Sequence, residues 1–450
     1  MGKNIVICAD GTGNSFAKSI SNVARMVRLL ALDDRDSQVA VYDQGIGTDA
    51  RRWQEILKFR ETICDTRSLH VLPGPHESWF PPAEFVALNW SLATGYGLRD
   101  NVRQMYGTLA KLYENGDAVF LFGFSRGAFT VRALAGLIYR CGLPRRGRAD
   151  FTRLFERAWE LFKRMHPLEA ETKEFWAIEG QRECPIHFLG VWDTVKSYGG
   201  FYPKLLPHLR HNPIVTHVRH AVALDEQRGW FDVTTWGRLD SDRKPDAAWS
   251  RLSKDVRDRI EKHDIEEVWF RGCHSDVGGG TQEARSAQIA LRWMLGEAAR
   301  AGLRLNSVGL CLLQRSPEHE QAEVHPSDTL LWRLIELVPR ATINNDGQWP
   351  KRVVAWRGAV RQPYERLRCG RMTVHESVGV KIAATKTLSS TRVTVDRALH
   401  FKRGCALRCL RGWVASAARW LAARRRVGGH GPDASERDGC AARLCRRDRR

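Results

Sequence analysis

An apolar run that ends in a glycine-flanked serine constrains this chain more than any other feature. Residues 118–122 (Ala-Val-Phe-Leu-Phe) predict a buried strand, Gly123-Phe-Ser-Arg-Gly127 follows directly, and an alanine-rich helical stretch covers 128–140. A strand, a tight turn and a helix in this order form a nucleophile elbow, which holds a serine hydroxyl above the carboxyl edge of a parallel sheet. A side chain at either glycine would collide with the backbone of such a turn. We therefore expect Ser125 to be a nucleophile; the alternative is an inert serine in a glycine-rich turn.

Strand-like runs alternate with helix-like stretches over the first 300 residues. The strands are expected at 4–9, 38–42, 118–122, 186–192, 220–224 and 267–270, and the helices at about 20–30, 102–112, 128–140, 151–165 and 286–301. This alternation is typical of a parallel sheet covered by helices. We predict a catalytic domain over 1–310, built on a doubly wound, mostly parallel α/β sheet of the α/β-hydrolase type. Residues 51–93, rich in Trp, Pro and charge, are predicted to be an insertion or lid.

The pattern changes towards the end of the chain. We expect an accessory C-terminal region at 311–400 and an arginine-rich tail at 401–450, which holds 14 Lys and Arg against four acids and so carries half of the net charge of +20. Within the tail, 404–426 has an apolar helical stripe with tryptophans and flanking arginines. This stripe fits either a solvated extension or an amphipathic helix on an anionic membrane. Nucleic-acid binding is not expected, because no base-reading module is present.

Two later strands end in the partners that a serine nucleophile needs. A serine hydroxyl attacks only after a base removes its proton, and an acid must orient that base. Asp193 follows the strand at 186–192, and His274 follows the strand at 267–270. The order Ser, Asp, His therefore predicts a catalytic triad of Ser125, Asp193 and His274. The structural alternatives are a helix-capping aspartate and a surface histidine.

Other residues compete for these roles. Asp225 also follows a strand and is the main rival of Asp193 as the acid. Asp276 lies only two residues from His274, so we expect it to order the loop instead. His220, at the start of its predicted strand, and His263, in a charged segment, are expected to point away from the carboxyl edge.

The tetrahedral intermediate needs hydrogen-bond donors for its oxyanion. One donor is expected to be the backbone N–H of Arg126, directly after the nucleophile. The second is expected to be the amide of Gly11, in the Asp10-Gly-Thr12 turn after the first strand. Taken alone, this turn would also suit phosphoryl hydrolysis with Asp10 as the nucleophile.

These motifs occur in the order seen in a known family. Over about residues 3–305 the chain resembles the α/β-hydrolase domain of unknown function that includes type VI secretion phospholipase effectors, with a fainter match at Val374-His-Glu-Ser377. The shared segments are Asp10-Gly-Thr-Gly-Asn14, Gly45-Ile-Gly47, the ten residues from Gly123 to Arg132, Gly190-Val-Trp-Asp-Thr194, Ala223-Leu-Asp-Glu226 and the nine residues from Gly272 to Gly280. The resemblance implies a Ser125–Asp193–His274 triad, esterase or lipase chemistry on lipid or phospholipid acyl esters, no metal and no cofactor. It also implies a secretion or immunity partner. A non-catalytic binding or toxin-partner module on the same scaffold is the alternative.

The composition bears on the cellular compartment. The first residues pass straight into a strand pattern rather than a signal peptide, and no apolar run reaches the roughly 18 residues that a membrane span needs. The eleven cysteines are scattered and odd in number, which favours free thiols over a disulfide framework. Cys405/Cys409 and Cys440/Cys445 lack zinc-site spacing. We expect a cytoplasmic protein in the producing cell, delivered by a leaderless secretion system or in peripheral contact with a membrane.

Overall fold

The computed structural model describes most of the first 314 residues and a few short stretches beyond them. The described residues are 2–11, 20–44, 68–72, 97–164, 169–195, 206–228, 231, 233–236, 248–260, 263–280, 285–314, 325, 340–341, 353–354, 373–375 and 393–394. Residues up to 394 belong to one compact unit. The arginine-rich tail at 401–450, its expected amphipathic helix at 404–426 and its four cysteines lie outside the described residues.

One nine-stranded sheet organises the described part of the chain, in the order β11-β10-β7-β6-β5-β4-β1-β2-β3. Neighbouring strands pair in parallel, except that β11 is antiparallel to β10. The strands are β1 (Asn4–Ala9), β2 (Gln38–Asp43), β3 (Leu69–Val71), β4 (Ala118–Phe124), β5 (Ile186–Trp192), β6 (Val215–Ala223), β7 (Asp264–Phe270), β10 (Thr373–Val374) and β11 (Val393–Thr394). The strand order reverses between β1 and β4, and open α/β sheets bind ligands at such a reversal. A separate antiparallel pair joins β8 (Arg340–Ala341) to β9 (Val353–Val354).

Helices cover both faces of the sheet. Alternate residues of β1 enter two different cores: Ile5 and Ile7 pack on one face, and Val6 and Cys8 on the other. The first core contains α4 (Leu98–Leu112), α5 (Arg126–Cys141), α6 (Phe151–Lys163), α7 (Glu169–Glu179) and α8 (Lys254–Ile260), and the second contains α1 (Asn22–Leu29), α10 (Arg285–Arg300) and α11 (Ser307–Gln314). The predicted doubly wound, mostly parallel α/β sheet is therefore confirmed.

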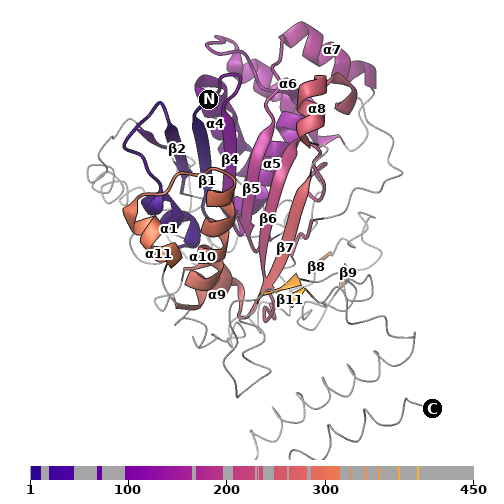
Figure 1. Cartoon of the computed structure of the whole chain (residues 1–450). Coiled ribbons are helices and arrows are strands. Elements are labelled where there is room, and N and C mark those ends of the chain that lie inside the picture. Colours follow the sequence, from indigo (N-terminus) through magenta and orange to yellow (C-terminus); the bar gives the residue numbers. More distant parts are fainter. Residues whose placement is uncertain are drawn as a thin grey trace, which may run out of the picture. The chain divides into compact units, whose positions relative to one another are not determined.

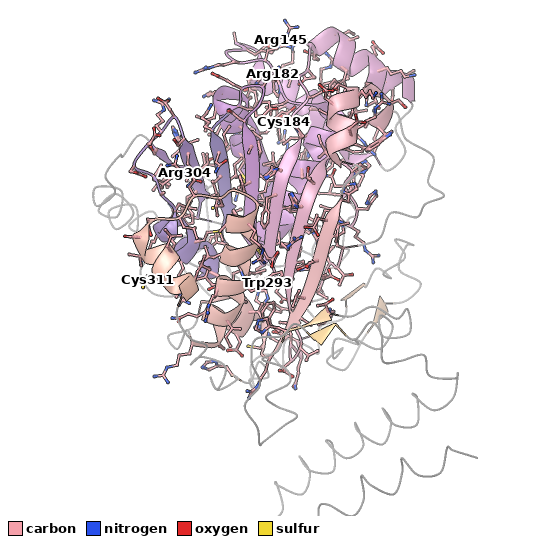
Figure 2. All side chains as sticks on the ribbon, in the orientation of Figure 1. Arg145, Arg182, Cys184, Trp293, Arg304 and Cys311 are labelled. Atoms are coloured by element: carbon pink, nitrogen blue, oxygen red, sulfur yellow. The ribbon has the colours of Figure 1, made fainter. Side chains whose placement is uncertain are left out.

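The two ends of the sheet carry different structures. Helices α6, α7 and α8 gather at the amino ends of β5 to β7, at the top of Figure 1, and the short helix α9 (His274–Gly278) lies at the carboxyl end of β7, at the bottom. Near the top of Figure 2, Arg182 donates to the carbonyls of Ala110, Tyr113 and Pro144 at 2.8–2.9 Å. Further down in Figure 2, the ring centroid of Trp293 in α10 lies 5.4 Å from that of Phe270. The loops that carry the predicted site residues lie at the carboxyl edge, opposite α6, α7 and α8.

Two sequence expectations need correction. Strand β6 begins at Val215, not His220, because the polar residues of its first half find ion-pair partners: Arg219 contacts Asp264 and Glu297. His220 therefore lies inside the strand rather than at its start. The predicted insertion at 51–93 contains the edge strand β3, which pairs with β2; the insertion is described only at 68–72, and any lid lies outside the described residues.

The end of the predicted catalytic domain also falls inside a helix. Helix α11 runs across residue 310, and the segment before it returns to the first βα unit, where Leu305 bridges Leu30 and the Asn306 amide donates to the Leu29 carbonyl at 2.9 Å. Further on, β10 pairs with β7. Part of the region that we expected to be accessory therefore extends the main sheet. Among the described cysteines, Cys8, Cys141, Cys184 and Cys273 are buried free thiols and Cys311 is an exposed one.

The turn after β4 gives a direct test of this packing. A Cβ on Gly127 would lie 2.1 Å from the Ala9 carbonyl oxygen of β1, whereas a Cβ on Gly296 in α10 would have its nearest neighbours at 3.9 Å, at the ends of side chains. We expect Gly127→Ala to lower the free energy of unfolding by about 1–3 kcal/mol through overpacking. Gly296→Ala is expected to raise it by about 0.5–1 kcal/mol, as helix-interior Gly→Ala changes do. Urea unfolding of both variants measures this, and equal effects would contradict the close contact between the turn and β1.

Candidate active site

Ser125 occupies the tight turn between β4 and α5. Its backbone has φ 57° and ψ −119°, a left-handed conformation that costs a non-glycine residue about 1–3 kcal/mol. The Ser125 amide donates to the Trp192 carbonyl of β5 at 3.0 Å, and the residue is 9% exposed. A Cβ on Gly123 would approach the Ala128 nitrogen to 2.6 Å, so glycine is required there. Ser125 thus has a positive φ at a turn where the preceding glycine packs closely against helix backbone.

Asp193 follows β5 at the same edge of the sheet and is fully buried. One carboxylate oxygen, Oδ1, accepts from the Ala223 amide at 2.9 Å, and the other, Oδ2, lies 2.5 Å from Nδ1 of His274. Its own amide donates to the Ala221 carbonyl at 2.7 Å. Both oxygens are therefore fixed, and one of them is directed at the imidazole.

His274 begins helix α9 and lies beside the elbow. Its ring centroid is 4.5 Å from the ring of Phe124, the residue before Ser125. Helix α9 packs so tightly here that a Cβ on Gly278 would overlap the Phe124 ring at 1.8 Å. Among the described residues, no hydrogen bond joins Ser125 Oγ to His274 Nε2. Such bonds often form or tighten only when a substrate binds.

The environment of His274 favours its neutral form. Burial lowers the pKa of His274, and the adjacent Asp193 carboxylate opposes this shift only in part. A neutral imidazole that donates from Nδ1 to Asp193 carries its lone pair on Nε2. This is the tautomer that can accept a proton from a hydroxyl.

The loop before α9 is held by carboxylates. Three successive backbone amides each donate to a different acid: Gly272 to Asp225 Oδ2 at 2.8 Å, Cys273 to Asp276 Oδ2 at 3.0 Å, and His274 to Glu226 Oε2 at 3.1 Å. Asp225, the predicted rival for the acid, thus binds the loop backbone, and it is Asp193 that contacts the imidazole. Asp276 orders the loop, as expected from the sequence.

Asp276 also ties the loop to more distant residues. Its Oδ1 accepts from Ser286 Oγ of the α10 segment at 2.9 Å and lies 2.6 Å from His325 Nδ1. The His325 amide donates to Oδ2 at 3.0 Å. Nothing in the sequence around His325 suggested this contact, because 49 residues separate it from its partner.

Glu226 and Arg228 were missed as site residues by the sequence reasoning. Arg228 donates to Glu226 from its backbone amide (2.7 Å), Nε (2.9 Å) and a terminal guanidinium nitrogen (2.8 Å). Although burial raises the pKa of Glu226, the hydrogen bonds and charge of Arg228 outweigh this effect and bring the pKa to about 2. Glu226 is therefore ionised next to His274. The Glu-x-Arg spacing after β6 was the available sequence signal.

The rival histidines are placed elsewhere. His220 lies 2.8 Å from Glu267 Oε2 through Nδ1, and its Nε2 accepts from the Thr194 amide at 3.2 Å. Through Nε2, His220 supports the turn after Asp193 at the carboxyl end of β5, so the expectation that it points away from this edge is wrong. His263 precedes β7 at the amino edge, away from Ser125.

The two predicted oxyanion donors differ in their surroundings. Arg126 is the first residue of α5, where amides point out of the helix; burial lowers the pKa of its guanidinium to about 9. The Gly11 amide instead donates to Asp10 Oδ1 at 2.7 Å. Asp10 Oδ2 accepts from Ser21 Oγ (2.7 Å) and Tyr42 OH (2.8 Å). Both oxygens of this buried carboxylate thus accept from groups of the fold, which does not favour a role as a phosphoryl nucleophile.

The described residues contain neither a metal-binding cluster nor a helix that could span a membrane. No group of three or more His, Cys, Asp or Glu side chains in the described residues is arranged to hold a metal ion. No described helix has the length and apolar character needed to cross a bilayer.

Known proteins similar to this chain include a yeast protein and two of solved structure. An uncharacterized protein of Saccharomyces cerevisiae is 32% identical over 241 residues, which cover 51% of this chain and 32% of the yeast protein. An uncharacterized protein from Pseudomonas aeruginosa is 20% identical, with a TM-score of 0.36, over 72% of this chain and 51% of its own. A Tle1 effector solved bound to the VgrG spike of the type 6 secretion system is 17% identical, with a TM-score of 0.28, over 62% and 51%. The chain thus spans about a third of the yeast relative and about half of each solved chain.

A family model also matches the sequence. The model of the type VI secretion system phospholipase effector Tle1-like catalytic domain matches residues 3–297, a range that contains Ser125, Asp193 and His274. The chain therefore belongs to the family of Tle1-like phospholipase effector catalytic domains of the type VI secretion system.

Proposed function

We propose that this protein is a serine hydrolase that cleaves carboxylic esters of lipids through an acyl-enzyme at Ser125. The observation that carries the proposal is the 2.5 Å contact between His274 Nδ1 and Asp193 Oδ2, beside a strained serine turn at the strand-order reversal. Membership in a phospholipase effector family supports lipid esters, and glycerophospholipids in particular, as the substrate class.

Each residue of the proposed triad has one task. His274 Nε2 takes the Ser125 proton while Oγ attacks the ester carbonyl carbon, and Asp193 orients and stabilises the resulting imidazolium. When the tetrahedral intermediate collapses, the same proton passes to the leaving alkoxide and the acyl group remains on Oγ. A water molecule, deprotonated by His274, then attacks the acyl-enzyme, and the proton returns to Oγ as the free acid leaves.

The oxyanion would be held by backbone amides. The Arg126 N–H lies at the start of α5, next to the nucleophile. The Gly11 N–H can contribute only if it exchanges Asp10 Oδ1 for the substrate oxygen. Loss of one such donor typically costs about 100- to 1000-fold in rate, so the Gly11 turn would control how fast the enzyme turns over.

We also propose roles in substrate access and delivery for residues outside the family match at 3–297. We propose that 1–310 carries the catalytic chemistry, that the expected accessory region at 311–400 extends the same unit as far as residue 394, and that 401–450 is a basic tail whose segment 404–426 contacts anionic membrane surfaces. The protein would reside in the cytoplasm of the producing cell, bind a secretion or immunity partner there, and be delivered by type VI secretion, as the family name suggests.

The nucleophile assignment is tested by Ser125→Ala. We expect this variant to lose at least about 10⁴-fold in kcat/KM towards short-chain esters and phospholipids, since the remaining groups cannot replace an attacking oxygen. A fluorophosphonate probe should label the unaltered protein and fail to label Ser125→Ala. Ser253→Ala, at an exposed serine that binds Glu183, is the matched control and should label normally. Unchanged turnover in Ser125→Ala would refute the mechanism, and an unlabelled parent protein would favour a non-catalytic scaffold.

The pH dependence follows from the burial of His274. The base must be neutral, and its pKa is lowered from the ordinary value of 6.5, mainly by burial. A lower pKa means that the imidazole stays deprotonated further into acid, so kcat/KM should remain flat through pH 6.5 and fall only below it. Asp193→Asn removes a charge that raises this pKa, so it should move the fall to still lower pH and reduce kcat by about 10⁴-fold. The profile is measured with an uncharged ester, and a midpoint above 6.5 would contradict a buried base.

A further inference from the structure

Glu226 is fully buried and contacts His274 without belonging to the proposed triad. It follows β6 by three residues, and its Oε2 accepts the backbone N–H of His274 at 3.1 Å. The same oxygen accepts from the Arg228 guanidinium at 2.8 Å, and Oε1 accepts from the Arg228 amide and Nε. The carboxylate therefore joins Arg228 to the backbone of His274.

Arg228 also acts on His274 indirectly, through the ring of Phe231. Its guanidinium carbon lies 3.7 Å from the centroid of the Phe231 ring, a stacked cation–π contact. The Phe231 ring in turn meets the His274 imidazole edge-on, with centroids 4.8 Å apart and an interplanar angle of 70°. Glu226 thus fixes the backbone of His274, and Phe231, held by Arg228, fixes its ring.

Holding a loop with a largely buried ion pair has a high cost in free energy. Desolvation of the two charges offsets much of their attraction, and a neutral hydrogen bond could hold one amide at lower cost. A pair of opposite charges has one advantage beside a catalytic base: it supplies rigid, directed contacts while adding no net charge next to the imidazole. The arrangement is therefore suited to setting geometry without biasing the protonation state.

We propose that Glu226 and Arg228 are paired positioning residues for His274, with Glu226 fixing its backbone and Arg228 holding Phe231 against its ring. This role rests on the hydrolysis proposed above, in which His274 is the base. It deepens that proposal by giving a function to the Glu-x-Arg spacing after β6.

Three charged groups act on the His274 imidazole, and a fourth, Asp276, binds the backbone next to it. Asp193 follows β5, Glu226 and Arg228 follow β6, and Asp276 lies on α9 itself. Burial has the largest effect and lowers the pKa of His274; Asp193 raises it, Arg228 lowers it and Glu226 raises it. Removing one member of the pair should therefore leave the other uncompensated, with opposite signs for the two removals.

Single and double variants exploit these opposite signs. Glu226→Gln should move the acid limb of kcat/KM to lower pH, and Arg228→Met should move it to higher pH. The double variant should return the limb to the parent position. Each is expected to lose about 10- to 100-fold in kcat with little change in KM, because a displacement of about 1 Å at a catalytic group costs about that much.

Arg228→Lys separates charge from geometry. Lysine keeps the positive charge but loses the planar stacking and the fork of donors. We expect the acid limb to stay at the parent pH while kcat still falls about tenfold.

Glu179→Gln provides a matched control. Glu179 is also a buried glutamate bound by arginines, Arg148 at 2.9 Å and Arg157, but it ends α7 at the opposite end of the sheet. Its loss should lower the unfolding temperature and leave both kcat and the acid limb unchanged. A similar fall in kcat in Glu179→Gln would show that lost stability alone explains the effect and would overturn the proposal.

The titration of His274 can also be followed without turnover. In a Ser125→Ala background, imidazole ¹⁵N NMR should report the same opposite shifts for Glu226→Gln and Arg228→Met. If a single variant does not fold, Arg228→Lys and the double variant carry the test. Unmoved titrations with an undiminished kcat overturn the positioning role even where Ser125 proves essential. An active Ser125→Ala instead overturns the proposed hydrolysis, while the NMR shifts still report on the pair.

Discussion

The contact between Asp193 and His274 is the interaction on which the site depends, and it is possible only because β5 and β7 end at one edge of a parallel sheet. The two residues are 81 positions apart in the chain, yet Nδ1 and Oδ2 lie 2.5 Å apart. The turn after β4 adds a serine whose backbone is strained and whose neighbouring glycines pack against strand and helix backbone. Burial then lowers the pKa of the imidazole, which favours its neutral form.

The main strands and helices could be predicted from the sequence because their apolar patterns are clear. Elements whose polar residues pair with distant partners could not be predicted in this way. The runs at 4–9, 118–122 and 186–192 appear as β1, β4 and β5 with at most small changes of their ends. The first half of β6 was missed because Arg219 is neutralised by acids from β7 and α10, and such partners are invisible in a linear pattern. The fold class, by contrast, follows from alternation alone.

In the site, too, residues marked by local patterns could be predicted, and contacts between distant segments could not. Strand ends and residue order place Ser125, Asp193 and His274 at one edge. The contacts that hold His274 come from Glu226 and from His325 acting through Asp276, and each requires knowledge of which loops meet. The Gly11 amide was expected to face the substrate; its bond to the neighbouring Asp10 carboxylate depends on a side-chain rotamer that a motif does not specify.

The return of the chain to its first βα unit has a practical consequence for recombinant work on this family. The matched family segment stops at residue 297, inside α10, whereas Leu305 and Asn306 pair with Leu30 and Leu29 beyond that point. An expression fragment that ended at residue 297 would truncate α10 and expose apolar residues of α1 to solvent. A minimal fragment should therefore extend past α11, to at least residue 314.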